Sequence, residues 1–93
     1  MPKITEAMAF QLAQARVNQL AQAAGDEFLI RVEKTQNVGQ GWVFFFNTSD
    51  FVKTGNPVSR LAGNGPIFVT NNGLVHDLPS SLPWEDALNL VHS

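Results

Sequence analysis

The sequence contains no cysteine, which removes several kinds of chemistry at once. Disulfide bridges, thiolate zinc sites and a cysteine nucleophile are excluded, and the absence fits a reducing compartment. Long hydrophobic runs are missing as well, because Gln, Arg and Asn interrupt the N-terminal segment and no charged-then-apolar leader precedes it. We therefore expect neither a signal peptide nor a membrane span, and a cytoplasmic location.

Charge of either sign is sparse. Lys and Arg number 6, Asp and Glu number 8, and the formal net charge is −2. Nucleic-acid binding needs clustered Lys and Arg, and so does attachment to an anionic membrane surface, so neither partner is expected. The hydrophobic fraction of 44% is ordinary for a globular protein and too high for a disordered one, so residues 1–93 are predicted to form a single domain.

Catalytic side chains are few. His76 precedes Asp77, but neighbours on a strand point to opposite faces, so the two form no base and orienting pair. His92 lies next to the C-terminus, the serines lack the context of a nucleophile, and no spacing of His, Asp or Glu matches a metal site. No catalytic residue, metal site or cofactor is therefore predicted.

The first element that the sequence predicts is a helix from Ile4 or Thr5 to Ala24, which Gly25 ends. At helical spacing, one face of it is apolar and is the predicted core face. That face comprises Phe10, Ala13, Val17, Leu20, Ala21 and Ala24. Nearly opposite lie Met8, Leu12 and Ala15, which either touch the same domain or stay at the surface, or else form a contact surface for a partner.

From Glu27 to Val38 the period changes to two, which predicts a half-buried strand with Phe28, Ile30 and Val32 on one face. Gly39-Gln40-Gly41 then predicts a hairpin loop into an aromatic strand, Trp42 to Asn47. Because side chains alternate, that strand must be covered on both sides. One cover is the domain's own helix, and the other is a second element, a loop layer or a partner. On one side point Trp42, Phe44 and Phe46, and on the other Val43 and Phe45.

The rest of the chain has clear turn signals. A helical turn is possible at Ser49–Lys53, with Ser49 or Asn47 as its cap and Phe51, Val52 and Leu61 as anchors. Ile67–Thr70, a type I′ turn at Asn71-Asn72-Gly73 and Leu74–His76 predict a second hairpin. Pro83 opens a short helix from Trp84 to about Val91. The order predicts an α+β fold: a long N-terminal helix on a four-stranded antiparallel sheet, with a short C-terminal helix.

The turn cluster Gly63-Asn64-Gly65-Pro66 leads into a strand and not a helix, so it is interpreted as a backbone corner and not as a phosphate loop. Together with the aromatic strand before it, the step Thr54-Gly55 and the later Gly73, this corner resembles the pattern of the immunity protein 35 family, also called YrhB-like. The resemblance spans most of the chain and is strongest from Gly41 to His76. The residues that carry this structural motif are Trp42, Phe44, Phe46, Gly63, Asn64 and Pro66.

The resemblance implies a bacterial immunity protein of a polymorphic-toxin or contact-dependent competition system. Such a protein is not an enzyme; it stays in the producing cell and binds a cognate toxin effector domain. The alternative that the resemblance leaves open is a heat-stable, chaperone-like domain that binds unrelated clients. A module that binds a small molecule would be a third class, and it would need a pocket.

The family pattern supplies no toxin-contact residues, so the contact surface is predicted from charge and aromatic placement. Trp42 is interpreted as a core residue, whereas Trp84 suits either the core or an exposed anchor beside two carboxylates. A homodimer through an edge strand or the Met8 stripe is also possible. The predicted toxin-binding residues are Asp50, Phe51, Asp77, Trp84, Glu85 and Asp86.

Overall fold

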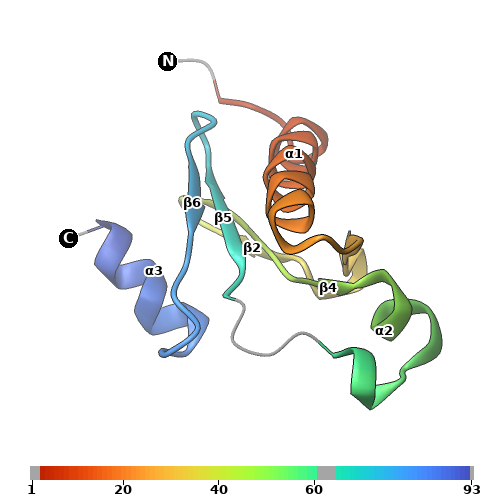
Figure 1. The fold of residues 1–93 in the computed structure, drawn as a ribbon. Helices are drawn as coiled ribbons and strands as arrows, with labels where there is room; N and C mark the ends of the chain where they lie inside the picture. Colours follow the sequence, from red (N-terminus) through yellow and green to blue (C-terminus); the bar gives the residue numbers. More distant parts are fainter. Residues whose placement is uncertain (1–2, 61–64, 93) are drawn as a thin grey trace.

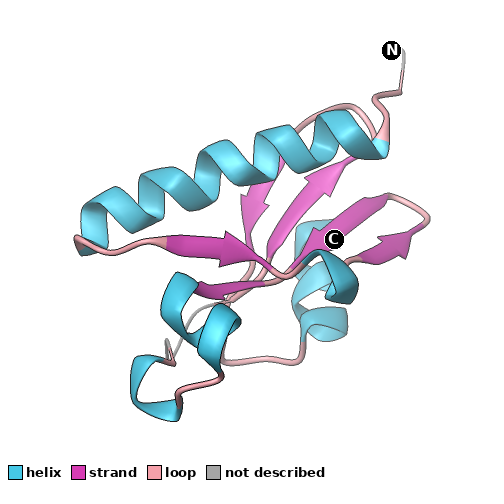
Figure 2. Cartoon of the chain, turned by 90° about the vertical axis from the view of Figure 1, so that its right-hand side faces the viewer, coloured by secondary structure: helices cyan, strands magenta, loops and turns pink. Residues whose placement is uncertain are grey.

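A long helix, α1 (Glu6–Ala24), covers one face of an antiparallel sheet in the computed structural model, which describes residues 3–60 and 65–92 (Figure 1). The helix begins where predicted, because the Thr5 side chain accepts a hydrogen bond from the Met8 amide at 3.2 Å. It ends at Gly25, whose φ of 67° is the left-handed conformation of a helix stop. Figure 2 shows α1 running across the sheet.

The strand predicted over Glu27–Val38 is not continuous. A single 3₁₀ turn, η1 (Val32–Lys34), divides it into β1 (Phe28–Ile30) and β2 (Gln36–Val38). The aromatic strand breaks opposite this turn at Phe45, into β3 (Gly41–Phe44) and β4 (Phe46–Thr48). The Arg31 amide donates to the Phe45 carbonyl at 2.7 Å, so the two breaks are joined. Val32, predicted to be on the buried face, is therefore turned outward and is 63% exposed.

In the part of the chain that the structure describes, six strands thus form two sheets in place of one. β1 pairs with β4, and the four-stranded sheet has the order β2-β3-β5-β6, where β5 is Ile67–Thr70 and β6 is Val75–Asp77. Every pair is antiparallel. The four-stranded antiparallel sheet under a long helix is confirmed, and the additional two-stranded sheet results from the break at Phe45.

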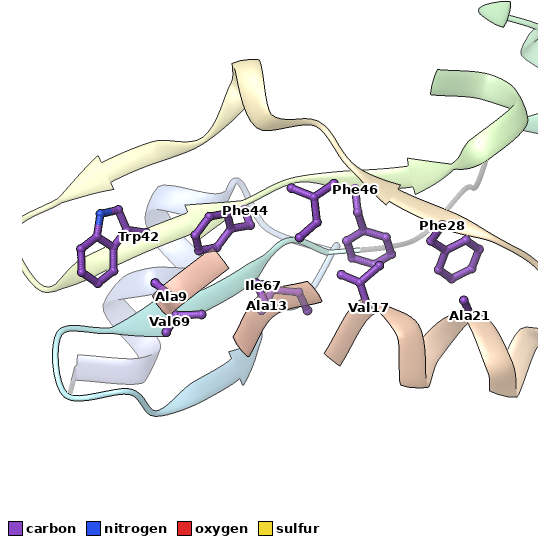
Figure 3. Packing of buried hydrophobic residues seen from close by; sticks show 11 residues of the cluster. Ala9, Ala13, Val17, Ala21, Phe28, Trp42, Phe44, Phe46, Ile67 and Val69 are labelled. Atoms are coloured by element: carbon purple, nitrogen blue, oxygen red, sulfur yellow. The ribbon is translucent and has the colours of Figure 1, made fainter. Parts of the chain in front are cut away.

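Alternation along the aromatic strand is as predicted. Trp42, Phe44 and Phe46 lie in the cluster beneath α1 (Figure 3), whereas Val43 lies in a second cluster on the other face with Phe45 packed against it. Trp42 is 8% exposed, which confirms its interpretation as a core residue. The contacts of α1 differ slightly from the prediction: the buried stripe has a strict spacing of four, so Ala9 joins it and Ala24 is exposed. Its members are Ala9, Ala13, Val17 and Ala21.

The second face of the sheet is covered by the chain itself. Helix α3 (Trp84–His92) lies on the side of the sheet opposite α1 (Figure 1). Its Ala87 and Leu88 are buried against Val43 and Phe68 of the sheet, together with Leu78. The second side of the aromatic strand, which the sequence required to be covered, is thus covered by a second helix of the chain.

Two local details differ from the sequence prediction. The loop Asn71–Gly73 has three residues, because the Thr70 amide donates to the Leu74 carbonyl at 2.9 Å and the Gly73 amide to the Thr70 carbonyl at 3.0 Å. Gly73 alone in this loop has a positive φ (88°), so the loop is a type I turn with a glycine bulge and not a type I′ turn.

The short helix α2 (Ser49–Thr54) is capped by Thr48, neither by Ser49 nor by Asn47. Thr48 has the extended backbone of a cap residue, whereas Ser49 is already helical. The Thr48 hydroxyl accepts from the Phe51 amide at 3.1 Å and donates to the Ser59 carbonyl at 2.7 Å. The second contact holds a 3₁₀ turn, η2 (Pro57–Ser59), against the end of β4.

Candidate functional site

The break in the aromatic strand exposes part of Phe45 between two hollows. One, the Trp84 hollow, has a volume of about 200 Å³ and is bordered by Trp84, Leu82, Pro66 and Pro79. The other, the basic hollow, has a volume of about 280 Å³. Phe45 and Phe46 line both, so the two hollows adjoin at the strand break. The basic hollow is lined by Arg31, Lys34, Phe45, Phe46, Asn47, Phe51 and Arg60.

The basic hollow is built by three segments that the sequence separates. Arg31 follows β1, Phe51 is on α2, and Arg60 follows η2. The guanidinium carbons of Arg31 and Arg60 lie 5.9 and 6.0 Å from the centre of the Phe51 ring, within cation–π range. Thr48 is the residue that sets this arrangement, because its hydroxyl holds both the start of α2 and the end of η2.

Few carboxylates neutralise this hollow. Arg31 Nε donates to Glu33 Oε1 at 3.1 Å, and the pKa of Glu33 is lowered by its own backbone hydrogen bond and by Arg31. Within residues 3–60 and 65–92, neither Lys34 nor Arg60 forms an ion pair. The chain as a whole is acidic, yet this part of its surface carries a local excess of positive charge.

The Trp84 hollow has no charged side chain in its lining among the described residues. Trp84 is half-buried and meets Phe45 edge to face, with ring centres 6.3 Å apart. Glu85 and Asp86 follow it in the first turn of α3 and are exposed, where the helix dipole favours anions. The strand break therefore has an aromatic centre, with three basic side chains in one hollow and, beyond the other hollow, the exposed Glu85 and Asp86 that follow Trp84 along α3.

The structure brings only part of the predicted surface together. Phe51 and Trp84 line the two adjoining hollows, with Asp50 next to Phe51, and Glu85 and Asp86 next to Trp84. The Asp50 carboxylate accepts a hydrogen bond from the Ser59 hydroxyl, which ties α2 to η2.

Asp77 lies apart from the other five, because it is turned to the α1 side of the sheet. Arg16 of α1 donates to both of its carboxylate oxygens, from Nε at 2.9 Å and from Nη2 at 2.5 Å. The hydrogen bond from Arg16 holds the pKa of Asp77 below its ordinary value. The same contact raises the pKa of Arg16.

The glycine-rich corner can be followed in part. Gly63 and Asn64 lie outside the described residues, as does Leu61, the predicted anchor. At Gly65 an added Cβ would lie 1.8 Å from the Leu78 carbonyl oxygen, and the Pro66 carbonyl accepts from the Leu78 amide at 2.9 Å. Close backbone approach is thus the reason for glycine at this position.

Sequence reasoning did not find the cluster of Arg31, Lys34 and Arg60. Arg31 precedes η1 and Lys34 ends it, but nothing in the spacing of the sequence places Arg60 beside them. Its position depends on how α2 and η2 fold back onto the strand break, which Thr48 determines through tertiary contacts.

A third concavity lies beside the first half of α1. It has a volume of about 540 Å³ and is largely apolar, with Phe10 and Phe44 in edge contact and Val32 at its border. The Thr35 hydroxyl in its lining is buried and has no hydrogen-bond partner among the described residues. The groove therefore offers a pocket whose described lining holds one buried, unpaired polar group.

Within the described part of the chain, no three His, Asp or Glu side chains come together as a group that could hold a metal ion. His76 stacks on the Phe68 ring, with ring centres 6.0 Å apart. In the same residues, no helix combines the length and the apolar character that a membrane span requires.

Comparison with known proteins gives one family and one curated relative. The family model for immunity protein 35 matches residues 7–89. The protein YrhB of Escherichia coli strain K12, which carries the description uncharacterized, is 40% identical over 50 residues. That match covers 53% of this chain and 53% of YrhB, so the chain spans about half the length of this relative. No solved structure matches the chain.

Proposed function

We propose, from the premise that this chain belongs to the immunity protein 35 family, that it neutralises a cognate toxin effector by binding it stoichiometrically. Inhibition then comes from covering the toxin's active site or from holding the toxin in an inactive conformation. The chain itself supplies no reaction, and its place of action is the cytoplasm of the producing cell.

The strand break at Phe45 is the observation that supports the choice of the toxin-binding surface. Both faces of the four-stranded sheet are covered by helices of the chain itself, so the aromatic side chains of the faces are committed to the core. At the break, Phe45, Phe51 and Trp84 are only half-buried and border two hollows. Half-buried aromatic residues surrounded by charged ones are typical anchors of protein interfaces.

We therefore place the toxin contact at Asp50, Phe51, Trp84, Glu85 and Asp86. Asp77 belongs to the same predicted set but lies on the α1 side, so it contributes only if the toxin reaches around the edge of the sheet. Carboxylates at the border of an interface chiefly accelerate association with an oppositely charged partner.

The test is co-expression with the protein encoded by the adjacent gene, followed by co-purification and kinetic binding measurements. We expect a one-to-one complex. Replacing Glu85→Gln and Asp86→Asn together should slow association roughly tenfold at low salt. A matched control is Asp26→Asn with Glu27→Gln, two adjacent exposed acids in the loop between α1 and β1, which should leave the rate unchanged.

Three results would contradict this proposal. Absence of a complex for the unaltered chain would remove the toxin-binding function itself. Protection of unrelated proteins from heat aggregation, with no preference for the adjacent gene product, would favour the chaperone-like alternative. If both double variants slowed association equally, the effect would be general electrostatics and the proposed surface would be wrong.

A further inference from the structure

We propose that the basic hollow receives a carboxylate side chain of an acidic, aromatic-containing segment of the partner protein. This inference rests on the proposed toxin-binding function and deepens it, because it names the chemistry of the segment that enters the surface. The occupant is an Asp or Glu placed between Arg31 and Arg60, with an apolar neighbour against the aromatic floor.

The guanidinium groups of Arg31 and Arg60 both lie near the Phe51 ring. Both guanidinium carbons lie about 6 Å from the centre of the Phe51 ring, and both side chains line the basic hollow, so two like charges border one hollow. Cation–π contact with the ring leaves guanidinium N–H groups able to bind a carboxylate, and Arg31 offers its Nη groups because its Nε donates to Glu33. An anion between them would relieve their repulsion, which gives the hollow a preference for negative charge.

Among the described residues, the cations of the basic hollow have few carboxylate partners. Glu33, which pairs with Arg31, is itself 63% exposed and stays at the border, and the described residues pair no carboxylate with Lys34 or Arg60. Arg60 and Lys34 are both exposed, so their charges are available to a partner.

The basic hollow is small and is lined in part by aromatic side chains. Its volume of about 280 Å³ is at the lower end of the roughly 300–1,000 Å³ of pockets that enclose small molecules, and it can accommodate a side chain projected by a protein. Phe45 and Phe51 provide an apolar floor beside the charges, which matches a segment that alternates acidic and aromatic residues.

A nucleic acid fits this surface less well than a protein does. Three cations line the hollow in a chain of net charge −2, whereas nucleic-acid binding depends on many clustered Lys and Arg. Asp50 of α2, next to Phe51 of the hollow, is exposed and would repel a phosphate backbone extending beyond it.

The probe is the synthetic peptide acetyl-Gly-Asp-Glu-Phe-Glu-Asp-Gly-amide, titrated into the ¹⁵N-labelled chain and followed by NMR. We expect the Arg31 and Arg60 Nε–Hε signals to shift, with binding that weakens as salt is added. The same peptide with Asn and Gln in place of its acids should cause no shift. Arg31→Gln with Arg60→Gln should weaken acidic-peptide binding roughly tenfold.

Lys53→Gln is the matched control, because Lys53 is an exposed cation on α2 that does not line the hollow. It should leave peptide affinity unchanged, and thermal unfolding should show that both variants are folded. Equal loss in Lys53→Gln and in the arginine variant would overturn the inference, and so would larger shifts with an eight-residue oligothymidylate than with the peptide.

The adjacent gene product separates failure of this inference from failure of the proposed function. If the unaltered chain binds that protein and the arginine variant binds it equally well, the acidic segment does not enter this hollow, while the toxin-binding function stands. If the unaltered chain does not bind it, the proposed function fails whatever the peptide shows. The inference is supported when the arginine variant loses affinity for both the peptide and the protein.

Discussion

At the scale of single residues, Gly41 shows how closely β3 and β5 approach. A Cβ at this position would lie 2.0 Å from the Val69 carbonyl oxygen, so the strands would have to separate. We expect Gly41→Ala to lower the free energy of unfolding by about 2–3 kcal/mol, in the range of other overpacked sites. Urea unfolding followed by circular dichroism measures the change.

Gly39 provides the matched control, because it lies two residues earlier in the same hairpin and an added Cβ meets nothing within 4 Å. Gly39→Ala should change the free energy of unfolding by less than about 0.5 kcal/mol. Equal stability of the two alanine variants would mean that β3 and β5 do not approach as closely as the structure shows.

Several residue roles were predictable from the sequence because they depend on local rules. Thr5 and Gly25 bound α1 through cap chemistry, and strict alternation separates the two faces of the aromatic strand. The meeting of Arg31 and Arg60 at Phe51 was not predictable, since no local rule relates positions brought together by a tertiary fold. The main helices and strands of this chain follow from local sequence patterns. The charged surface at the strand break depends instead on how residues 49–60 fold back onto the sheet.

At the scale of elements, the strand break is the main feature that periodicity missed. A period of two continues through Val32 in the sequence, so nothing in the hydrophobic pattern marks the 3₁₀ turn. The turn accommodates a change of register: the Arg31 amide bonds to the Phe45 carbonyl, but Gln36 pairs with Val43, so five residue steps on one side face two on the other. This break also creates the candidate site, because it is where Phe45 becomes accessible.

The ion pair between Arg16 of α1 and Asp77 of β6 joins the helix to the edge of the sheet, and it predicts a pH dependence. Because the folded-state pKa of Asp77 is lowered, the pair stabilises the fold fully above about pH 4, the pKa of an unfolded Asp. This stabilisation is lost as the pH falls through the lowered folded-state pKa. Asp77→Asn should therefore lower the Tm at pH 7 by a few degrees at most, since the pair is largely exposed.

Thermal unfolding at pH 7 and again near pH 2 provides the measurement. The difference in Tm between the unaltered chain and Asp77→Asn should shrink on acidification. Glu27→Gln, an exposed acid outside the ion pairs of the described residues, should show no such difference at either pH. A difference for Asp77→Asn that grows at low pH would contradict the assignment.

At the scale of the whole molecule, the sheet is the layer that both cores share. β3 and β5 contribute Trp42 and Val69 to the cluster under α1, and Val43 and Phe68 to the cluster under α3. With both faces covered, the surfaces left for partners are the outer strands β2 and β6, the exposed side of α1 and the strand break. A homodimer through an edge or through Met8 and Leu12 stays a prediction.

The two tryptophans can test whether residues 1–93 unfold as one domain, because each reports on a different face of the sheet. Trp42 lies in the cluster under α1, and Trp84 packs against the cluster under α3. Since both clusters share β3 and β5, neither face can lose its packing without exposing the strands that support the other. We expect Trp84→Phe, which leaves Trp42 as the reporter, and Trp42→Phe, which leaves Trp84, each to unfold in a single transition.

Fluorescence and far-ultraviolet circular dichroism are compared within each variant, so that any loss of stability from the substitution itself cancels. Coincident midpoints in urea for both variants would establish one cooperative unit. If the Trp84 signal changed at a lower urea concentration than the circular dichroism of the same variant, α3 would separate from the sheet before the rest unfolds. That result would make α3 a movable element, and Glu85 and Asp86 would move away from the sheet together with it.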